Sequence, residues 1–273
     1  PFPTNRQEGH QGNPMDNETA LVTEIKVETN SRVNFAMQQN DVPVVQAVRI
    51  ENRTSNDLGD LQLRITSDPG FLVPLTMQIA SVGASSSYSL PEIDLELSPK
   101  FLGEITERIR GQFRFELLRG EQLLAQHVEP VLLLARDEWS GLSVLPEILA
   151  AFVTPNHPAI DGLLRDAADL LGSWGHDTSL SGYQSGQPRH VYAMVAAIYA
   201  AVQRSGITYV NPPASFENEG QRIRLPGRIA GSQLATCLDL SALAAGCLEQ
   251  AGLNSLIVLV NGHAVCGVWL QDE

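Results

Sequence analysis

The sequence contains few cysteines, and its three cysteines include no CxxC pair. An odd number of cysteines without paired spacing argues against a disulfide framework and favours free thiols in a reducing compartment. The cysteines and histidines also lack the spacing of a zinc site, and no GxxxxGK[ST] phosphate loop is present. We therefore expect no metal and no other cofactor.

Positive charge and long apolar runs are scarce as well. Lysine and arginine total 18 against 31 acidic residues, which gives a net charge of -13. A protein this acidic is not expected to bind nucleic acid directly, because that function needs a basic face. The longest apolar run, residues 193–202, is too short to span a membrane, and no signal peptide is recognisable. We expect a cytoplasmic protein that does not bind membranes.

The chain is long enough and apolar enough to fold around substantial cores. Its 273 residues are 43% hydrophobic and 18% charged, which favours two globular domains. Residues 1–18 are the exception, since they combine turn formers with almost no hydrophobic side chains and predict a flexible leader. The first residue is Pro1 and the last residues resemble a strand, so we expect an excised piece of a longer protein.

Residues 19–138 have the two-residue period of β-strands. The apolar positions of two representative segments are Leu58, Leu61, Leu63 and Ile65 in the first, and Ile93, Leu95 and Leu97 in the second. Polar turn segments separate such runs, and Arg119-Gly120 is a hairpin signal. This pattern predicts an antiparallel β-sandwich of the immunoglobulin-like class, without the Cys…Trp…Cys pattern of antibody domains.

Residues 139–273 change to helical periodicity. Amphipathic patterns predict helices near 145–152, 157–174, 187–206 and 236–252. A β-hairpin that turns at Asn261-Gly262 follows the last helix. The chain is therefore expected to have an α+β fold, with a domain boundary near Trp139.

Cys237 and His263 are the candidate catalytic residues. Cys237 is predicted in the first turn of the last helix, directly after the expected cap Thr236, and a helix N-terminus stabilises a thiolate. His263 begins the second strand of the hairpin, from which a base can reach the helix start. A free cysteine in an apolar helix is more often a small core residue, which is how we interpret Cys247 and Cys266. That structural role remains the alternative for Cys237.

The segment "TCLDLSALAAGCLEQAGLNSLIVLVNGHAVCGVWL" resembles the core of the transglutaminase-like superfamily, which has a papain-like fold. The matching positions are Cys237, Asp239, Ala251-Gly252-Leu253, Gly262-His263-Ala264 and Val268-Trp269. The resemblance implies a transglutaminase-like α+β domain over residues 139–273, truncated at its C-terminus. It further implies that Cys237 is the nucleophile and His263 the general base and acid of a cysteine peptidase or acyl transferase.

The same resemblance calls for a third residue that orients the histidine, normally on the strand that follows. Asp272 stands at an odd offset from His263 and is expected on the opposite face, so the third residue is expected beyond the end of this sequence. An oxyanion donor is also needed, and Gln233 or Gln221 is a candidate beside the Cys237 backbone N–H. Asp239 is interpreted as a structural acid at the helix start.

A longer resemblance involves the segments "DEWSG", "LPEILAAFVTPNHP", "GYQSG" and "YVNPPASFENEGQRIRLP". They are similar to the N-terminal region of very large bacterial proteins that carry a superfamily 1 DNA helicase, often with a nuclease-like end, and are associated with genome defence. The resemblance implies that downstream helicase domains are partners of this chain. Three functions stay open: thiol chemistry on a peptide or protein amide, a catalytically inactive papain-like interaction module, and a sandwich-based assembly platform of unknown oligomeric state.

Overall fold

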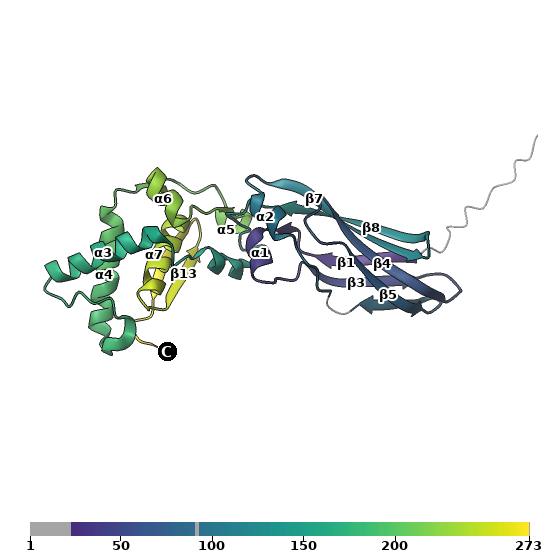
Figure 1. Ribbon diagram of the computed structural model, residues 1–273, viewed down its shortest axis with the longest axis horizontal. Coiled ribbons are helices and arrows are strands. Elements are labelled where there is room, and N and C mark those ends of the chain that lie inside the picture. Colours follow the sequence, from purple (N-terminus) through teal and green to yellow (C-terminus); the bar gives the residue numbers. More distant parts are fainter. Residues whose placement is uncertain (1–22, 91–92, 273) are drawn as a thin grey trace, which may run out of the picture.

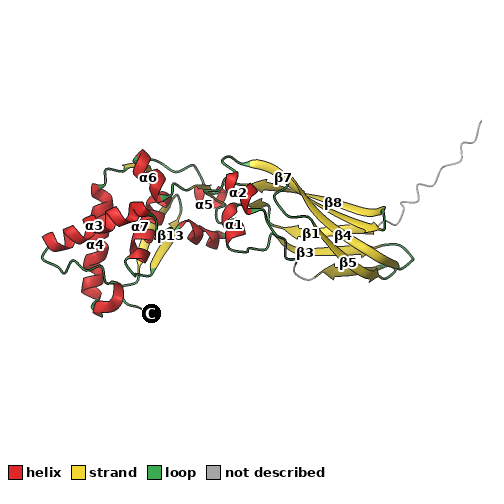
Figure 2. Ribbon diagram, viewed as in Figure 1, coloured by secondary structure: helices red, strands yellow, loops and turns green. Residues whose placement is uncertain are grey.

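The structure is a computed structural model that describes residues 23–90 and 93–272. The predicted leader, residues 1–18, lies outside them. Figure 1 shows an elongated molecule with β-sheets at one end and helices α3 (Pro158–Ser173) and α4 (Pro188–Arg204) at the other. Figure 2 shows most of the strands at one end of the molecule and most of the helices at the other. The expected α+β class is confirmed.

The first half of the chain forms two sheets, with strand orders β1-β3-β6 and β2-β8-β7-β4-β5. Neighbouring strands are antiparallel apart from the parallel pair β2 and β8. The strands are β1 (Thr23–Thr29), β2 (Arg32–Val33), β3 (Val45–Asn52), β4 (Leu58–Asp68), β5 (Leu75–Val82), β6 (Ser86–Leu90), β7 (Ile109–Arg119) and β8 (Gln122–Leu133). Two short helices, α1 (Phe35–Gln39) and α2 (Pro99–Glu104), interrupt them.

Side chains from both sheets meet in one hydrophobic cluster, which is the arrangement of a β-sandwich. The four apolar positions predicted for β4 are all buried. Leu58 and Leu61 both point inward although they are three residues apart, and Asp60 between them has a left-handed φ of 54°. The hairpin between β7 and β8 turns at Gly120, as predicted. The immunoglobulin-like assignment stays a prediction.

The strand predicted around Ile93, Leu95 and Leu97 is wrong. In the described residues this segment has no sheet partner beyond an isolated bridge between Leu72 and Leu97. Ile93 and Leu97 are nonetheless buried against the sandwich core. The alternation of apolar residues therefore predicted correctly that one face of the segment is buried. A β-strand also needs a neighbouring strand with which its backbone groups form hydrogen bonds.

The second half is mainly helical. Its elements are β9 (Glu138–Trp139), the 3₁₀ helix η1 (Pro146–Phe152), α3, the 3₁₀ helix η2 (Gly182–Ser185), α4, β10 (Thr208–Tyr209), α5 (Phe216–Glu219), β11 (Gln221–Arg222), α6 (Pro226–Ser232), β12 (Leu234–Ala235), α7 (Cys237–Gln250), β13 (Ser255–Val260) and β14 (His263–Val268). The predicted helices and the final hairpin are present, although the first of those helices is 3₁₀. Apolar side chains of α3, α4 and α7 share one cluster.

A further hydrophobic group, here called the junction cluster, joins the two halves next to Cys237. Its buried members are Ala36, Met37, Trp139, Ile148, Leu149, Phe152, Phe216, Ile223, Cys237, Leu238, Ala242 and Ala264. Polar contacts reinforce it, because Arg32 donates to the Ser140 carbonyl at 2.6 Å and Asn34 donates to the Glu138 carbonyl at 2.8 Å. The predicted domain boundary near Trp139 stays a prediction, since side chains from both sides of it pack together here.

Helix α5 is held tightly against the segment that follows β9. The Leu142 N–H donates to the Glu217 carbonyl at 2.7 Å. Gly220 and Gly141 have left-handed φ values of 77° and 84°, and a Cβ at Gly220 would overlap the Trp139 carbonyl. Only glycine permits both this conformation and this close approach of two backbones.

We expect Gly220→Ala to lower the free energy of unfolding by about 3 kcal/mol, since it adds both strain and overlap. Gly231→Ala is the matched control, because a Cβ there meets nothing within 4 Å and its φ is not left-handed. That control is expected to change stability by less than about 1 kcal/mol. Urea unfolding of both variants measures the difference, and equal losses would contradict the packing described for α5.

Candidate active site

The start of α7 is fixed by a reciprocal pair of hydrogen bonds. The Thr236 hydroxyl accepts from the Asp239 N–H at 3.3 Å, and the Asp239 carboxylate accepts from the Thr236 N–H at 2.8 Å. Such a capping box satisfies backbone donors that a helix start leaves free. The predicted cap at Thr236 is confirmed, and Cys237 is the first residue of the helix.

Asp239 anchors the same helix start to the chain before α6. Its carboxylate is fully buried and accepts from the Arg224 N–H at 2.8 Å and from the Arg224 guanidinium at 2.9 Å. The Arg224 guanidinium therefore forms an ion pair with the Asp239 carboxylate. These contacts give Asp239 the structural role that its position suggested.

The final hairpin places His263 at the start of β14. Strands β13 and β14 are antiparallel, and Val260 lies opposite His263 across the turn. Ala264 is buried in the junction cluster, whereas His263 is exposed, since successive strand residues point to opposite faces. Cys266 and Val268 follow Ala264 on the face that packs against the α3–α4–α7 cluster.

Cys237 and His263 line the same cavity, which has a volume of about 600 Å³. Helix α4, helix α7, strand β14 and Tyr209 form its walls. Cys237 is only 3% exposed, so the cavity is the route by which a reagent reaches its sulfur. Among the described residues, no hydrogen bond joins the Cys237 thiol to the His263 ring. Hydrogen bonds between catalytic groups are often long or poorly aligned before a substrate binds.

Tyr209 is a site residue that sequence reasoning missed. It lies on β10, which pairs in parallel with β12 so that Tyr209 is opposite Ala235, two residues before Cys237. Burial of its hydroxyl, followed by the charge of Cys237 and a hydrogen bond with it, raises the pKa of Tyr209. The phenol is therefore protonated at neutral pH and can donate to a Cys237 thiolate. No local pattern in the sequence connects Tyr209 with Cys237.

The other two thiols differ from Cys237 in their surroundings. Cys247 is fully buried in the middle of α7, and burial, then the charge of Cys266, raise its pKa to about 12. Cys266 is partly buried, and burial, then the charge of Glu249, raise its pKa to about 11. Both thiols stay protonated at neutral pH, as suits core residues.

The two glutamine side chains considered as oxyanion donors lie elsewhere. Gln233 ends α6 and donates to the Ala230 carbonyl at 2.9 Å. Gln221 is buried and donates to the Thr236 hydroxyl at 2.9 Å. Neither lines the cavity that holds Cys237 and His263. Asp272 also lies outside its lining, and it accepts from the Asn254 amide at 3.4 Å.

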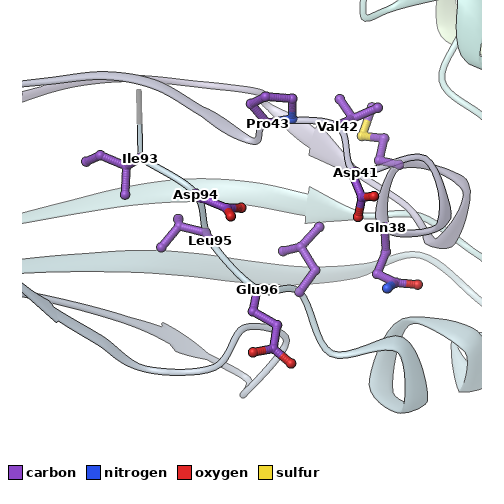
Figure 3. A pocket seen from close by; sticks show the side chains of 10 residues that line it. Gln38, Asp41, Val42, Pro43, Ile93, Asp94, Leu95 and Glu96 are labelled. Atoms are coloured by element: carbon purple, nitrogen blue, oxygen red, sulfur yellow. The ribbon is translucent and has the colours of Figure 1, made fainter. Parts of the chain in front are cut away.

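A separate cavity of about 750 Å³ lies between α1 and the segment 93–97 (Figure 3). Figure 3 shows the carboxylates of Asp41, Asp94 and Glu96 around it, and its described lining includes neither cysteine nor histidine. An acidic cavity without a nucleophile is a weaker candidate for chemistry than the cavity beside Cys237.

Residues 23–90 and 93–272 contain neither a group of side chains suited to bind a metal ion nor a helix suited to span a membrane. No group of three or more histidine, cysteine, aspartate or glutamate side chains in this part of the chain is placed to hold a metal ion. Likewise, none of the helices described there combines the length and the apolarity needed to cross a bilayer.

Comparisons with known proteins leave the family open. No protein-family model matches the chain, and no curated protein matches it. Among solved structures, the chain matches a Bacteroides uniformis β-glucuronidase and B. uniformis β-glucuronidase 2 covalently bound to cyclophellitol-6-carboxylate aziridine. Each match has 16% identity and covers 43% of this chain but 13% of the other, with TM-scores of 0.25 and 0.23. Matches this weak carry no conclusion about fold or function.

Proposed function

We propose that this chain carries a cysteine–histidine site for cleaving or transferring the acyl group of a peptide or protein amide. One observation carries the proposal: Cys237, at the capped start of α7, and His263, 26 residues later, line one cavity. A helix start favours the thiolate, and the histidine that lines the same cavity is the residue we assign as the proton-transfer group that a thiol nucleophile needs.

The chemistry proceeds in two stages. The Cys237 thiolate attacks the amide carbonyl, the C–N bond breaks, and protonated His263 gives its proton to the leaving amine. A water or a second amine then attacks the thioester while His263 removes its proton, which releases the acyl product and restores the thiolate. Water gives hydrolysis and an amine gives acyl transfer. The Tyr209 hydroxyl, next to the sulfur, helps to stabilise the thiolate between turnovers.

The proposed context is a transglutaminase-like, papain-like domain that follows a β-sandwich in a large bacterial helicase-type protein. Its support is the motif that runs from Cys237 to Trp269, together with the helix-then-hairpin order of α7, β13 and β14. In that context the chain is cytoplasmic, belongs to a genome-defence protein and works beside the downstream helicase domains.

The experiment that tests the site measures alkylation of Cys237 by iodoacetamide at pH 7, using mass spectrometry. His263→Ala is expected to slow the reaction by at least about tenfold, because the thiolate loses its proton-transfer partner. His176→Ala is the control, since His176 is an exposed histidine outside the cavity lining. Equal rates in the wild type and in His263→Ala would refute the proposal.

A non-catalytic interaction module is the second candidate. The outer face of the hairpin favours it, because Leu256, Val258, Val260 and Val265 are each 38–48% exposed on adjacent positions of β13 and β14. Exposed aliphatic patches often mark protein contacts. This candidate predicts that Cys237 is alkylated at the same rate in the wild type and in His263→Ala. The same experiment therefore separates the two functions.

A further inference from the structure

The Glu217 carboxylate lies beside the turn that carries His263. Its Oε1 accepts from the Gly262 N–H at 3.4 Å, and Gly262 immediately precedes His263. Its Oε2 is buried, and among the described residues no group donates to it. A buried carboxylate oxygen without a hydrogen bond lowers the stability of the fold, so buried oxygens of this kind usually accept a hydrogen bond from a donor.

The backbone around Glu217 cannot move away from this turn without cost. Its neighbour Phe216 is buried in the junction cluster together with Cys237 and Ala264. The Glu217 carbonyl accepts from the Leu142 N–H, and Gly220 is packed against the Trp139 carbonyl. The carboxylate is therefore presented to the hairpin turn by a rigid support, as a positioning group requires.

The His263 side chain follows Gly262, whose N–H contacts Glu217, directly in the sequence. It is exposed and makes no hydrogen bond with any residue in the described part of the chain. We propose that Glu217 is the positioning residue for His263: its Oε2 accepts a hydrogen bond from one ring N–H and leaves the other nitrogen for Cys237.

This inference rests on the proposed function, and it places the third member of the site 46 residues before His263. The resemblance to transglutaminase-like proteins put that member after the histidine strand instead. A short acidic helix, α5, thereby receives a role that the sequence analysis did not assign to any of its residues.

The first test observes the hydrogen bond directly by NMR of the protein labelled with ¹⁵N-histidine. A ring N–H bonded to a buried carboxylate is expected to give a downfield proton signal protected from exchange. That signal should vanish in His263→Ala, which assigns it, and weaken or vanish in Glu217→Gln. Glu219→Gln is the matched control, because Glu219 is on the same helix but pairs with Arg32 at 3.0 Å. Absence of any protected His263 signal in the wild type would overturn the inference without any variant.

The second test measures Cys237 alkylation at pH 7. Glu217→Gln is expected to slow it at least tenfold, while Glu219→Gln leaves the rate unchanged. If His263→Ala slows alkylation but Glu217→Gln does not, the proposed site stands and this inference fails. If Cys237 is inert in every form, the proposed function fails, and the ring N–H signal still decides whether Glu217 holds His263.

Discussion

At pH 7, iodoacetamide is expected to modify Cys237 at least about a hundred times faster than Cys247 or Cys266. The slow thiols have pKa values raised to about 12 and about 11. Their thiolate fractions at pH 7 are therefore on the order of 10⁻⁵ and 10⁻⁴. Cys237 begins a capped helix, whose dipole stabilises a thiolate, and it faces a cavity of about 600 Å³ through which the reagent can reach its sulfur.

The pH dependence of the three rates sharpens this expectation. Below the pKa of a thiol, its thiolate fraction rises tenfold for each pH unit, so labelling of Cys266 should rise about a hundredfold from pH 7 to pH 9. Labelling of Cys237 should already be fast at pH 7, because its sulfur faces the cavity and lies at a capped helix start, which stabilises a thiolate. Peptide mapping after timed labelling gives the three rates separately. Three parallel pH profiles would contradict the activated site.

Asp239→Ala is expected to lower the free energy of unfolding by about 3 kcal/mol. The substitution removes one half of the capping box and leaves Arg224, which is partly buried, without its ion pair. The start of α7 then loses the contacts that place Cys237, so alkylation should slow as well.

The matched control for Asp239→Ala is Thr236→Ser, which keeps the capping oxygen and is expected to cost less than about 1 kcal/mol. Urea unfolding of both variants measures the two losses. A loss below about 1 kcal/mol for Asp239→Ala would show that the buried carboxylate contributes little to the helix start.

Local signals in the sequence predicted the helices and the hairpin well. The cap at Thr236, the turn at Asn261-Gly262 and the inward face of β4 all follow from residues within a few positions of one another. Such signals depend on backbone preferences and on amphipathic spacing, which act over short separations. They also placed Cys237 at the first turn of its helix.

Contacts between segments far apart in the sequence could not be predicted from such local signals. Tyr209 reaches Cys237 through the two-residue pairing of β10 with β12, and Glu217 reaches the hairpin turn from 45 residues away. A strand of two residues and a helix of four residues are too short to show a periodicity, so neither neighbour of the site was predicted. The strand prediction around Ile93 failed for the opposite reason: the alternation was clear, but within residues 23–90 and 93–272 the segment pairs only through the isolated bridge between Leu72 and Leu97.

The junction cluster has a consequence for how such a chain can evolve. Met37, from the strand-rich half, is fully buried in this cluster, which also contains Trp139 and Cys237. A recombination event that exchanged the sandwich for an unrelated one would remove part of the cluster that contains Cys237. A sandwich with a smaller side chain at the position of Met37 would therefore need a larger residue elsewhere in the cluster to keep it filled.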